Sequence, residues 1–253
     1  MDALPVAIEG IGWWSPGIDG WPAACAQLRD GGLALVDGAA RPAAGVLSPN
    51  ERRRAPGPVL LACEVAQQAC RMAGRDAATL ACVFASAHGD VAITDAMCRT
   101  LADEPLTLSP TLFHNSVHNA PAGYWTVATA CHAPSSALSA WHDSLAAGLF
   151  EAAVQAHADE VPVLFAMYDI AACGALQGVV DAPFPYALAF VLSPGPHRGG
   201  ATARVALRHE DAAAAGSTPS ESAARLLGWL ASGPAGTLRL PNGGATLAIE
   251  ALA

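Results

Sequence analysis

The chain has 253 residues, of which 53% are apolar and 14% are charged, a balance that indicates a folded protein with a large core and excludes a disordered one. Its formal net charge of −9 excludes a broad nucleic-acid-binding surface, because phosphate recognition needs clustered positive charge. All 13 basic residues are arginines, which excludes a Schiff-base lysine and a lysine of the P-loop type.

Hydrophobic periodicity predicts alternating strands and helices along the whole chain. The first half is expected to contain, in order, a strand (Val6–Ile11), a turn (WWSPG), a helix (Trp21–Arg29), a helix (Pro58–Ala73) ended by Gly74, a strand (Thr79–Ser86), a helix from Asp90 to Ala102 and a polar loop (Leu106–His118). After a helix from Asn119, the second half is expected to contain a strand (Ser136–Ala140), a helix (Asp143–His157), a strand (Val161–Met167), an adjacent strand pair (Ala187–Leu192 and Ala201–Leu207), a helix from the capping box at Thr218 to Leu230, and a hairpin (Thr237–Leu240 and Ala245–Ile249). This order indicates an α/β protein with a central sheet, organised as one domain over residues 1–253.

The seven cysteines show no CxxC spacing and fall mostly in apolar segments, where a free thiol behaves as a small hydrophobic group. This usage is typical of a reducing compartment. The N-terminus has an early acidic residue and no long apolar stretch, so no signal peptide is expected, and no apolar run reaches the ~18 residues of a membrane span. We therefore expect a cytoplasmic protein that does not span a membrane.

Two stretches of sequence resemble ketoacyl synthases. The opening, VAIEGIGWWSPGIDGWPAACAQLRDGG, is similar to the start of that family, and FHNSVHNAPAGYWTVA resembles the Asn-x-x-Ala-Gly helix that precedes its nucleophile strand. The full pattern most resembles the short chain length factors of aryl polyene pigment pathways. The resemblance implies a thiolase-like layered α-β-α fold, in which residues 1–210 match the N-terminal half of ketoacyl synthases and residues 211–253 form a shortened C-terminal helix plus hairpin.

Two alignments compete for the position of the family's nucleophilic cysteine. One places Cys131 on the family's Thr-Ala-Cys motif, but it deletes the turn and strand that normally come before that cysteine. The other runs without gaps, places Ala133-Pro134-Ser135 on the family's Gly-Pro-Ser turn, and puts His142 at the nucleophile position. We favour the second alignment because a nucleophile elbow needs a strand before it and a helix after it. The predicted helix Asp143–His157 follows His142 directly.

A chain without this cysteine, and without the two histidines that the family uses for condensation, is expected to be catalytically silent. The resemblance then implies a chain length factor that needs no cofactor and pairs with a genuine β-ketoacyl synthase, extending chains on an acyl carrier protein. In isolation the chain could form a homodimer. Two alternatives stay open: a stand-alone acyltransferase or thioesterase that uses Cys131, and an acyl-binding module without a synthase partner.

Several further residues are candidates for the acyl tunnel or the partner interface: Phe113, His114, His118, Asn119, Tyr124, Trp125 and Trp141. His114 and His118 have the i, i+4 spacing of a helical metal pair, but no third ligand is apparent and no metal site is expected. Arg52, Arg53 and Arg54 could contact the acidic carrier protein, the alternative being a solvated charge run. The competing interpretations are a helix cap for His142 and an inert buried thiol for Cys131.

Overall fold

The computed structural model describes residues 3–33, 40–195 and 200–252. Within these residues the strands form one sheet in the order β4-β3-β5-β6-β1-β7-β9-β8, and the short β2 pairs with β1. The strands are β1 (Leu4–Ser15), β2 (Ile18–Asp19), β3 (Ala81–Ala85), β4 (Ser135–Leu138), β5 (Val163–Asp169), β6 (Tyr186–Pro194), β7 (Ala203–Glu210), β8 (Thr237–Asn242) and β9 (Ala245–Ala251). The α-helices are α1 (Trp21–Arg29), α2 (Pro49–Arg54), α3 (Gly57–Ala73), α4 (Val91–Asp103), α5 (Pro110–Asn115), α6 (Ala120–Thr129), α7 (Ser144–Asp159) and α8 (Pro219–Ala231).

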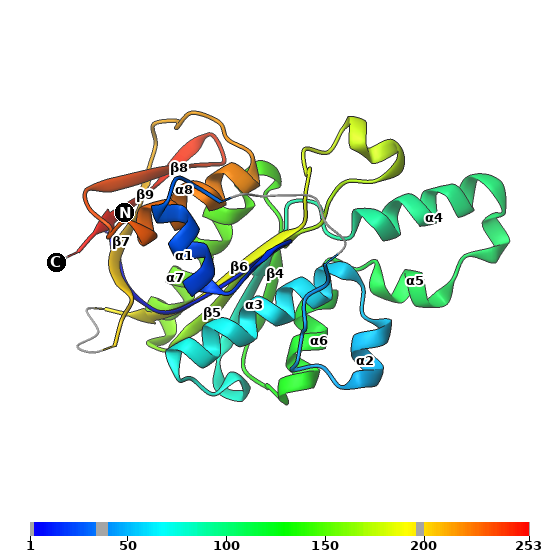
Figure 1. Ribbon diagram of the computed structural model, residues 1–253, viewed down its shortest axis with the longest axis horizontal. Coiled ribbons are helices and arrows are strands. Elements are labelled where there is room, and N and C mark those ends of the chain that lie inside the picture. The colour runs from blue at the N-terminus through cyan, green and yellow to red at the C-terminus, as the bar shows by residue number, and fades with distance from the viewer. Residues whose placement is uncertain (1–2, 34–39, 196–199, 253) are drawn as a thin grey trace.

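Helices cover both faces of the sheet, as Figure 1 shows. On one face α3 packs across β1, β6 and β5 with α6 beside it, and on the other face α7 packs on β5 and β3, with α1 and α8 packed on the same core. Successive side chains of a strand point to opposite faces, so β5 contributes Phe165 to one core and Leu164 to the other. The predicted α-β-α layering is confirmed.

The predicted pairing of the strands near Ala187–Leu192 and Ala201–Leu207 is wrong. β1 lies between β6 and β7 and pairs antiparallel with both of them. It can do so because it is longer than predicted: it continues through Trp13, Trp14 and Ser15, which the sequence had suggested were part of a turn. The chain reverses only after Ser15, where β2 pairs back onto the end of β1.

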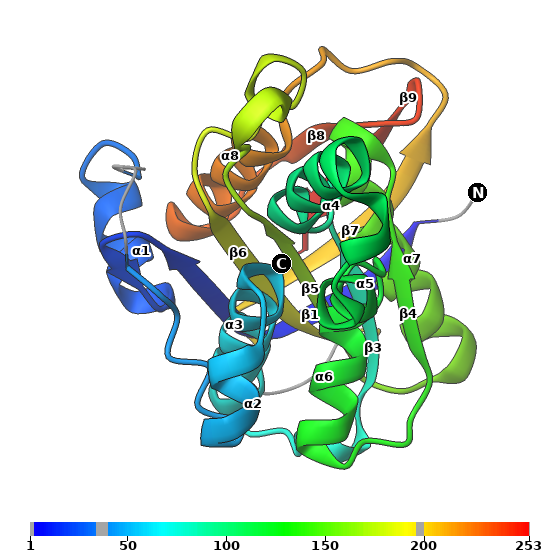
Figure 2. The same ribbon diagram turned by 90° about the vertical axis from the view of Figure 1, so that its right-hand side faces the viewer.

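Two short helices were not predicted. α5 lies inside the segment expected to be a loop, and the Ser109 side chain accepts a hydrogen bond from the Leu112 amide at its start. α2 begins with a capping box formed by Ser48 and Glu51. Together α4, the turn after it and α5 form an arm (residues 91–115) that projects from the sheet in Figure 1 and faces the viewer in Figure 2.

Helix α3 lies unusually close to β1 because two residues of the strand have no side chain. A Cβ atom at Gly12 would lie 2.1 Å from the carbonyl oxygen of Val65, and one at Gly10 would lie 2.1 Å from that of Ala69. Neither backbone can move away without disturbing the packing of α3 on the sheet. The contact therefore sets the distance between the helix layer and the sheet.

We expect Gly12→Ala to lower the free energy of unfolding by about 2 kcal/mol or more, because the added methyl group overpacks a rigid contact. Gly123→Ala is the matched control, since a Cβ there meets nothing within 4 Å, and alanine should stabilise helix α6 by up to about 1 kcal/mol. Guanidinium denaturation followed by circular dichroism measures both changes. Equal stability of the two variants would contradict this account.

Candidate functional site at the end of strand β4

Strand β4 leads into helix α7 through an elbow formed by residues 139–143. β4 is parallel to β3 at the edge of the sheet, and after it comes a short 3-10 turn, Trp141–Asp143, before α7 begins at Ser144. Trp141 has a φ of 54°, in the left-handed region. Bulky residues rarely adopt this conformation, and such strain concentrates at functional sites. The strained residue of the elbow is thus Trp141, the residue directly before His142.

Hydrogen bonds fix the backbone of the elbow. The buried Ser144 hydroxyl accepts from the Ala140 amide at 2.9 Å and donates to the Trp141 carbonyl at 2.7 Å. The Asp143 carboxylate accepts a 2.7 Å hydrogen bond from the Gly243 amide, which lies in the turn between β8 and β9. The elbow is therefore held by α7 on one side and by the C-terminal hairpin on the other.

Two histidines pack against the Trp141 indole, which is 55% exposed. The His88 ring meets it edge-on, with ring centroids 4.9 Å apart, and the His142 ring lies nearly parallel to it at 5.5 Å. Burial, and then the charge of nearby His142, lower the pKa of His88, which favours a neutral imidazole. The His88 Nε2 atom is buried and has no hydrogen-bond partner among the described residues.

A hollow of about 570 Å³ lies beside the elbow. Trp141, His142 and Asp143 line it from the elbow, and the β8–β9 turn closes another side. The remaining lining residues come from the segment before α8 and from its first turn: Ala213, Ala214, Gly216, Ser217, Thr218 and Glu221. Its walls combine small apolar residues with the hydroxyl groups of Ser217 and Thr218 and with two carboxylates. A mixed lining of this kind suits polar groups and water better than a bare hydrocarbon chain.

The buried carboxylate of Asp169, at the end of β5, holds the segment that carries His88. Its Oδ1 accepts hydrogen bonds from the Ser86 hydroxyl at 2.8 Å and from the Ala87 and His88 amides at 3.0 and 3.2 Å. The Tyr186 hydroxyl donates to Oδ2 at 3.4 Å. Burial raises the pKa of Asp169 to about 6, although these hydrogen bonds oppose the shift. Sequence reasoning missed this residue, and an acidic residue that ends an apolar strand was the available signal.

Cys131 lies apart from the elbow. It lies two residues after the end of α6 and precedes β4, whereas the elbow follows β4. The side chain of Cys131 is buried, and its thiol donates a 3.3 Å hydrogen bond to the Leu80 carbonyl. No helix starts next to it.

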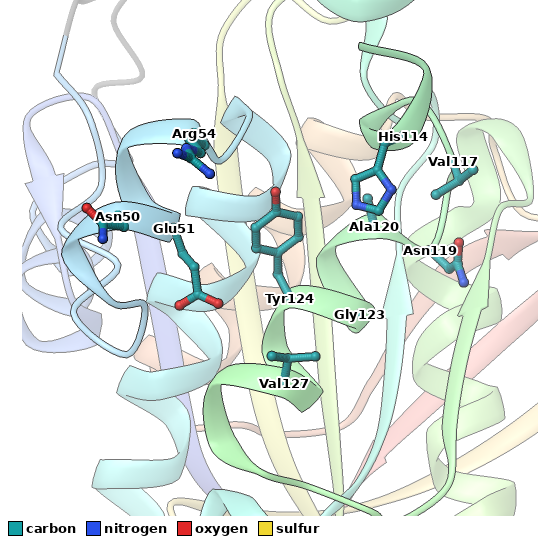
Figure 3. Close-up of a pocket in the computed structure, with 10 residues that line it drawn as sticks. All are labelled: Asn50, Glu51, Arg54, His114, Val117, Asn119, Ala120, Gly123, Tyr124 and Val127. Carbon is teal, nitrogen blue, oxygen red and sulfur yellow. The ribbon is translucent and has the colours of Figure 1, made fainter. Parts of the chain in front are cut away.

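Three of the candidate tunnel or interface residues share a second pocket. His114, Asn119 and Tyr124 line a hollow of about 520 Å³ between α2 and the α5–α6 segment, and Arg54 lies at its edge (Figure 3). Val127 adds an apolar wall.

The remaining candidates lie elsewhere. Phe113 is 61% exposed on α5, and a ring nitrogen of His118 lies 3.3 Å from the Ser86 carbonyl oxygen. Trp125 is fully buried in the core beneath α3. Sequence reasoning thus grouped residues that the fold distributes between a pocket, a core and the elbow.

His114 and His118 do not share a helical face, because α5 ends at Asn115. In the part of the chain that the structure describes, no three His, Cys, Asp or Glu side chains are placed to hold a metal ion together. Within the same residues, no helix combines the length and apolar character needed to cross a membrane.

The family of the beta-ketoacyl synthase N-terminal domain matches residues 25–238. The chain belongs to this family. The predicted relationship to ketoacyl synthases is therefore confirmed. No curated protein matches the sequence.

Solved ketosynthase structures share the fold. A chain from the ketosynthase (ApeO) in complex with its chain length factor (ApeC) from Xenorhabdus doucetiae is similar with a TM-score of 0.79 and 24% identity, over 98% of this chain and 99% of that one. The ishigamide ketosynthase/chain length factor is similar with a TM-score of 0.68 and 12% identity, over 97% and 98% of the two chains. The ketosynthase complex AntDE:AntF, a type II system with its acyl-carrier protein, is similar with a TM-score of 0.66 and 13% identity, over 82% and 69%. The predicted thiolase-like ketosynthase fold is confirmed.

We expect Asp169→Asn to change how the stability of this ketosynthase-like fold depends on pH. The folded-state pKa of about 6 lies above the ordinary 3.8, so the folded state binds the proton more tightly and wild-type stability falls as the pH rises through that window. Asparagine keeps an acceptor oxygen and buries no charge. From pH 4 to neutral pH, the variant should gain about 2 kcal/mol of unfolding free energy relative to wild type.

Urea denaturation at several pH values measures this difference. Asp169→Ala is the control, and it should be less stable than wild type at acidic and neutral pH because it leaves the Ala87 and His88 amides without their acceptor. A constant stability difference between Asp169→Asn and wild type across the pH range would refute the assignment.

Proposed function

We propose that this chain is a non-catalytic ketosynthase-like subunit, a chain length factor that pairs with a catalytic β-ketoacyl synthase. The observation that carries the proposal is the elbow between β4 and α7, which holds Trp141 and His142 and no cysteine. Condensation needs a thiolate to carry the acyl group, and neither side chain can form a thioester. The fold of the synthase is kept while the group that performs its covalent step is absent from the elbow.

The position of Cys131 supports catalytic silence. A reactive cysteine is usually accessible and activated by a helix N-terminus or a nearby base. Cys131 is 6% exposed, lies at the opposite end of β4 from the elbow, and directs its thiol to a carbonyl oxygen. These features favour a packing role for Cys131 over the acyltransferase and thioesterase alternatives.

The side of the molecule formed by β4, α5 and α6, which we call the partner face, is the proposed docking surface. β4 is one of the two edge strands of the described sheet, and α5 and α6 lie on the same side of the molecule in Figure 2. Phe113 and Val127 expose 61% and 72% of their surface there, and Leu106 at the end of the arm is fully exposed. Open strand edges and clustered exposed apolar groups mark interaction surfaces. A ketosynthase would cover this face in the complex, and a second copy would cover it in an isolated homodimer.

Helix α2 is the proposed contact for an acyl carrier protein. Arg52, Arg53 and Arg54 follow one another there, in a chain whose net charge is −9. Arg54 makes no ion pair or hydrogen bond with any residue that the structure describes, and it lies beside the apolar wall of the 520 Å³ pocket. A carrier protein with an acidic surface would be steered to this local positive charge.

The sequence resemblance supports a role in a pigment pathway of the aryl polyene type. We also propose that the protein is cytoplasmic. All seven cysteines are free, which supports a reducing compartment. We treat residues 1–253 as one domain because β9 pairs with β7 and so joins the C-terminal hairpin to the main sheet. No cofactor enters the proposal, since the partner's thiol and hydrogen-bond donors suffice for condensation.

Reconstitution with the ketosynthase of the same pathway tests the proposal. We expect a stable heterodimer by size-exclusion chromatography with light scattering, and intact mass should show the acyl group on the ketosynthase after incubation with acyl carrier thioesters. The length distribution of the products should change when this chain is left out. An acyl adduct on Cys131, or products independent of this chain, would contradict the proposal.

Arg54→Glu is expected to weaken binding of the acidic carrier protein to the heterodimer by about tenfold at low salt, because it reverses the charge at the proposed contact. Arg71→Glu, an equally exposed reversal in the last turn of α3, is the matched control and should leave the affinity within about twofold. Surface plasmon resonance at low and high ionic strength measures both. Equal losses in the two variants would show a non-specific charge effect.

A further inference from the structure

The pocket between α2 and the α5–α6 segment has the size of a small-molecule site. Its volume of about 520 Å³ falls within the usual range for such sites, roughly 300–1,000 Å³. Among the described residues it shares no lining residue with the hollow at the elbow. We propose that this pocket binds a small organic monocarboxylate with an apolar body, such as a free medium-chain acid. The site rests on residues of this chain alone, and only its consequence for the carrier protein rests on the proposed function.

Arg54 is the cation that holds the carboxylate in this proposal. It is the last of three arginines in a row on α2, and the other two already have partners. Arg52 donates a 3.2 Å hydrogen bond to the Ala43 carbonyl, and Arg53 donates to the Asn50 side chain. Arg54 lines the pocket and has no ion pair or hydrogen bond with any residue that the structure describes. An unpaired guanidinium can bind a carboxylate through two parallel hydrogen bonds.

The walls of the pocket suit the apolar body of the ligand. Val117 and Val127 line it and expose 49% and 72% of their surface. The Tyr124 ring forms another wall, and its position is fixed because its hydroxyl donates a 3.2 Å hydrogen bond to Asn115. Gly123 leaves space between them, since a Cβ atom there would meet nothing within 4 Å. Covering these groups with hydrocarbon removes apolar surface from water, which favours binding.

The two ends of the pocket differ in charge. In Figure 3 the Arg54 guanidinium and the His114 ring lie toward one end, where a ring nitrogen can donate a second hydrogen bond to the carboxylate. The Glu51 carboxylate and Val127 lie toward the other end. One oxygen of Glu51 accepts a 3.2 Å hydrogen bond from the Ser48 amide, which holds the negative charge in place. A second carboxylate on the ligand would be repelled there, so the pocket favours a monocarboxylate over a dicarboxylate.

Occupation of the pocket would affect the contact proposed for the acyl carrier protein. Hydrolysis of an acyl thioester by water gives a free carboxylic acid and a thiol, so a system that handles acyl thioesters is a source of such acids. An acid bound to Arg54 neutralises the positive charge that is proposed to steer the acidic carrier to α2. The pocket would therefore make carrier binding sensitive to the concentration of free acid.

Isothermal titration calorimetry on the isolated chain tests the site with defined probes. We expect octanoate to bind about fivefold more tightly than 1-octanol, which lacks the charge, and than octanedioate, which carries a second one. From butanoate to octanoate the affinity should rise about threefold per methylene until the pocket is filled. Titration with 4-phenylbutanoate shows whether the walls prefer an aromatic or an aliphatic body. Equal binding of octanoate and octanol, or no binding of either, would overturn the proposal.

Two variants locate the ligand. Arg54→Gln should remove the fivefold preference for octanoate and leave the affinity for octanol unchanged, whereas Arg71→Gln, which removes the same charge from α3, should keep the preference. Gly123→Leu should fill the pocket and abolish binding of both probes, and leucine suits a helix, so circular dichroism should show a folded protein. Octanoate binding that survives Gly123→Leu in a folded protein would place the ligand elsewhere. If Gly123→Leu does not fold, the comparison of Arg54→Gln with Arg71→Gln decides.

A competition measurement separates this inference from the proposed function. Saturating octanoate should weaken carrier binding to the reconstituted heterodimer by about fivefold in surface plasmon resonance, and it should have little further effect on Arg54→Gln. If octanoate binds the chain and carrier affinity does not change, the site stands and the proposed carrier contact at α2 is wrong. If octanoate does not bind the chain while the heterodimer forms and extends acyl chains, the inference fails and the proposed function stands.

Discussion

The buried carboxylate of Asp169 is the interaction on which the functional end of the molecule depends. A charge in this position is costly unless it is fully hydrogen-bonded, and it recruits donors from the segment after β3 and from Tyr186 on β6. The segment so fixed carries His88, which packs on the Trp141 indole, and Asp90, whose side chain accepts from the Ile93 amide at the start of α4. One carboxylate, at the end of β5, thus holds the segment after the neighbouring parallel strand β3, and this segment contacts the elbow and leads into the arm.

The elbow has a strained geometry although it holds no cysteine. A left-handed tryptophan costs about 1–3 kcal/mol, and such a cost persists only where the surroundings over-determine the conformation. In many active sites such strain orients a reacting group, and here the strained residue carries a large aromatic side chain. On the proposed function, the partner carries out the chemistry. The elbow of this chain would then serve only as part of the lining of a tunnel that the two subunits share.

Local features of the structure could be predicted from the sequence and non-local ones could not. The bounds of α1 and the capping box at Thr218 match the prediction because both depend on neighbouring residues: α1 has a proline in its first turn, and the capping box acts within one turn of α8. The separation of β6 and β7 by β1 was missed, since strand order depends on contacts between distant segments. The elbow was predicted at His142, but the residue with the left-handed conformation is Trp141. Tryptophan rarely adopts a positive φ, so its position could not be predicted from residue preferences. The Asp169 network joins three strands, so no single stretch of sequence shows it.

The charged residues that line the two hollows suggest different roles for them. The hollow at the elbow is lined by Asp143 and Glu221, whereas the pocket beside α2 is lined by Arg54 and Glu51, with Arg52 and Arg53 next to them on the helix. An acidic carrier protein would be repelled from the first and attracted to the second. On the proposed function, docking at α2 would place the carrier next to α6 and the partner face, so its acyl group would be delivered toward the partner's thiol and away from the elbow of this chain.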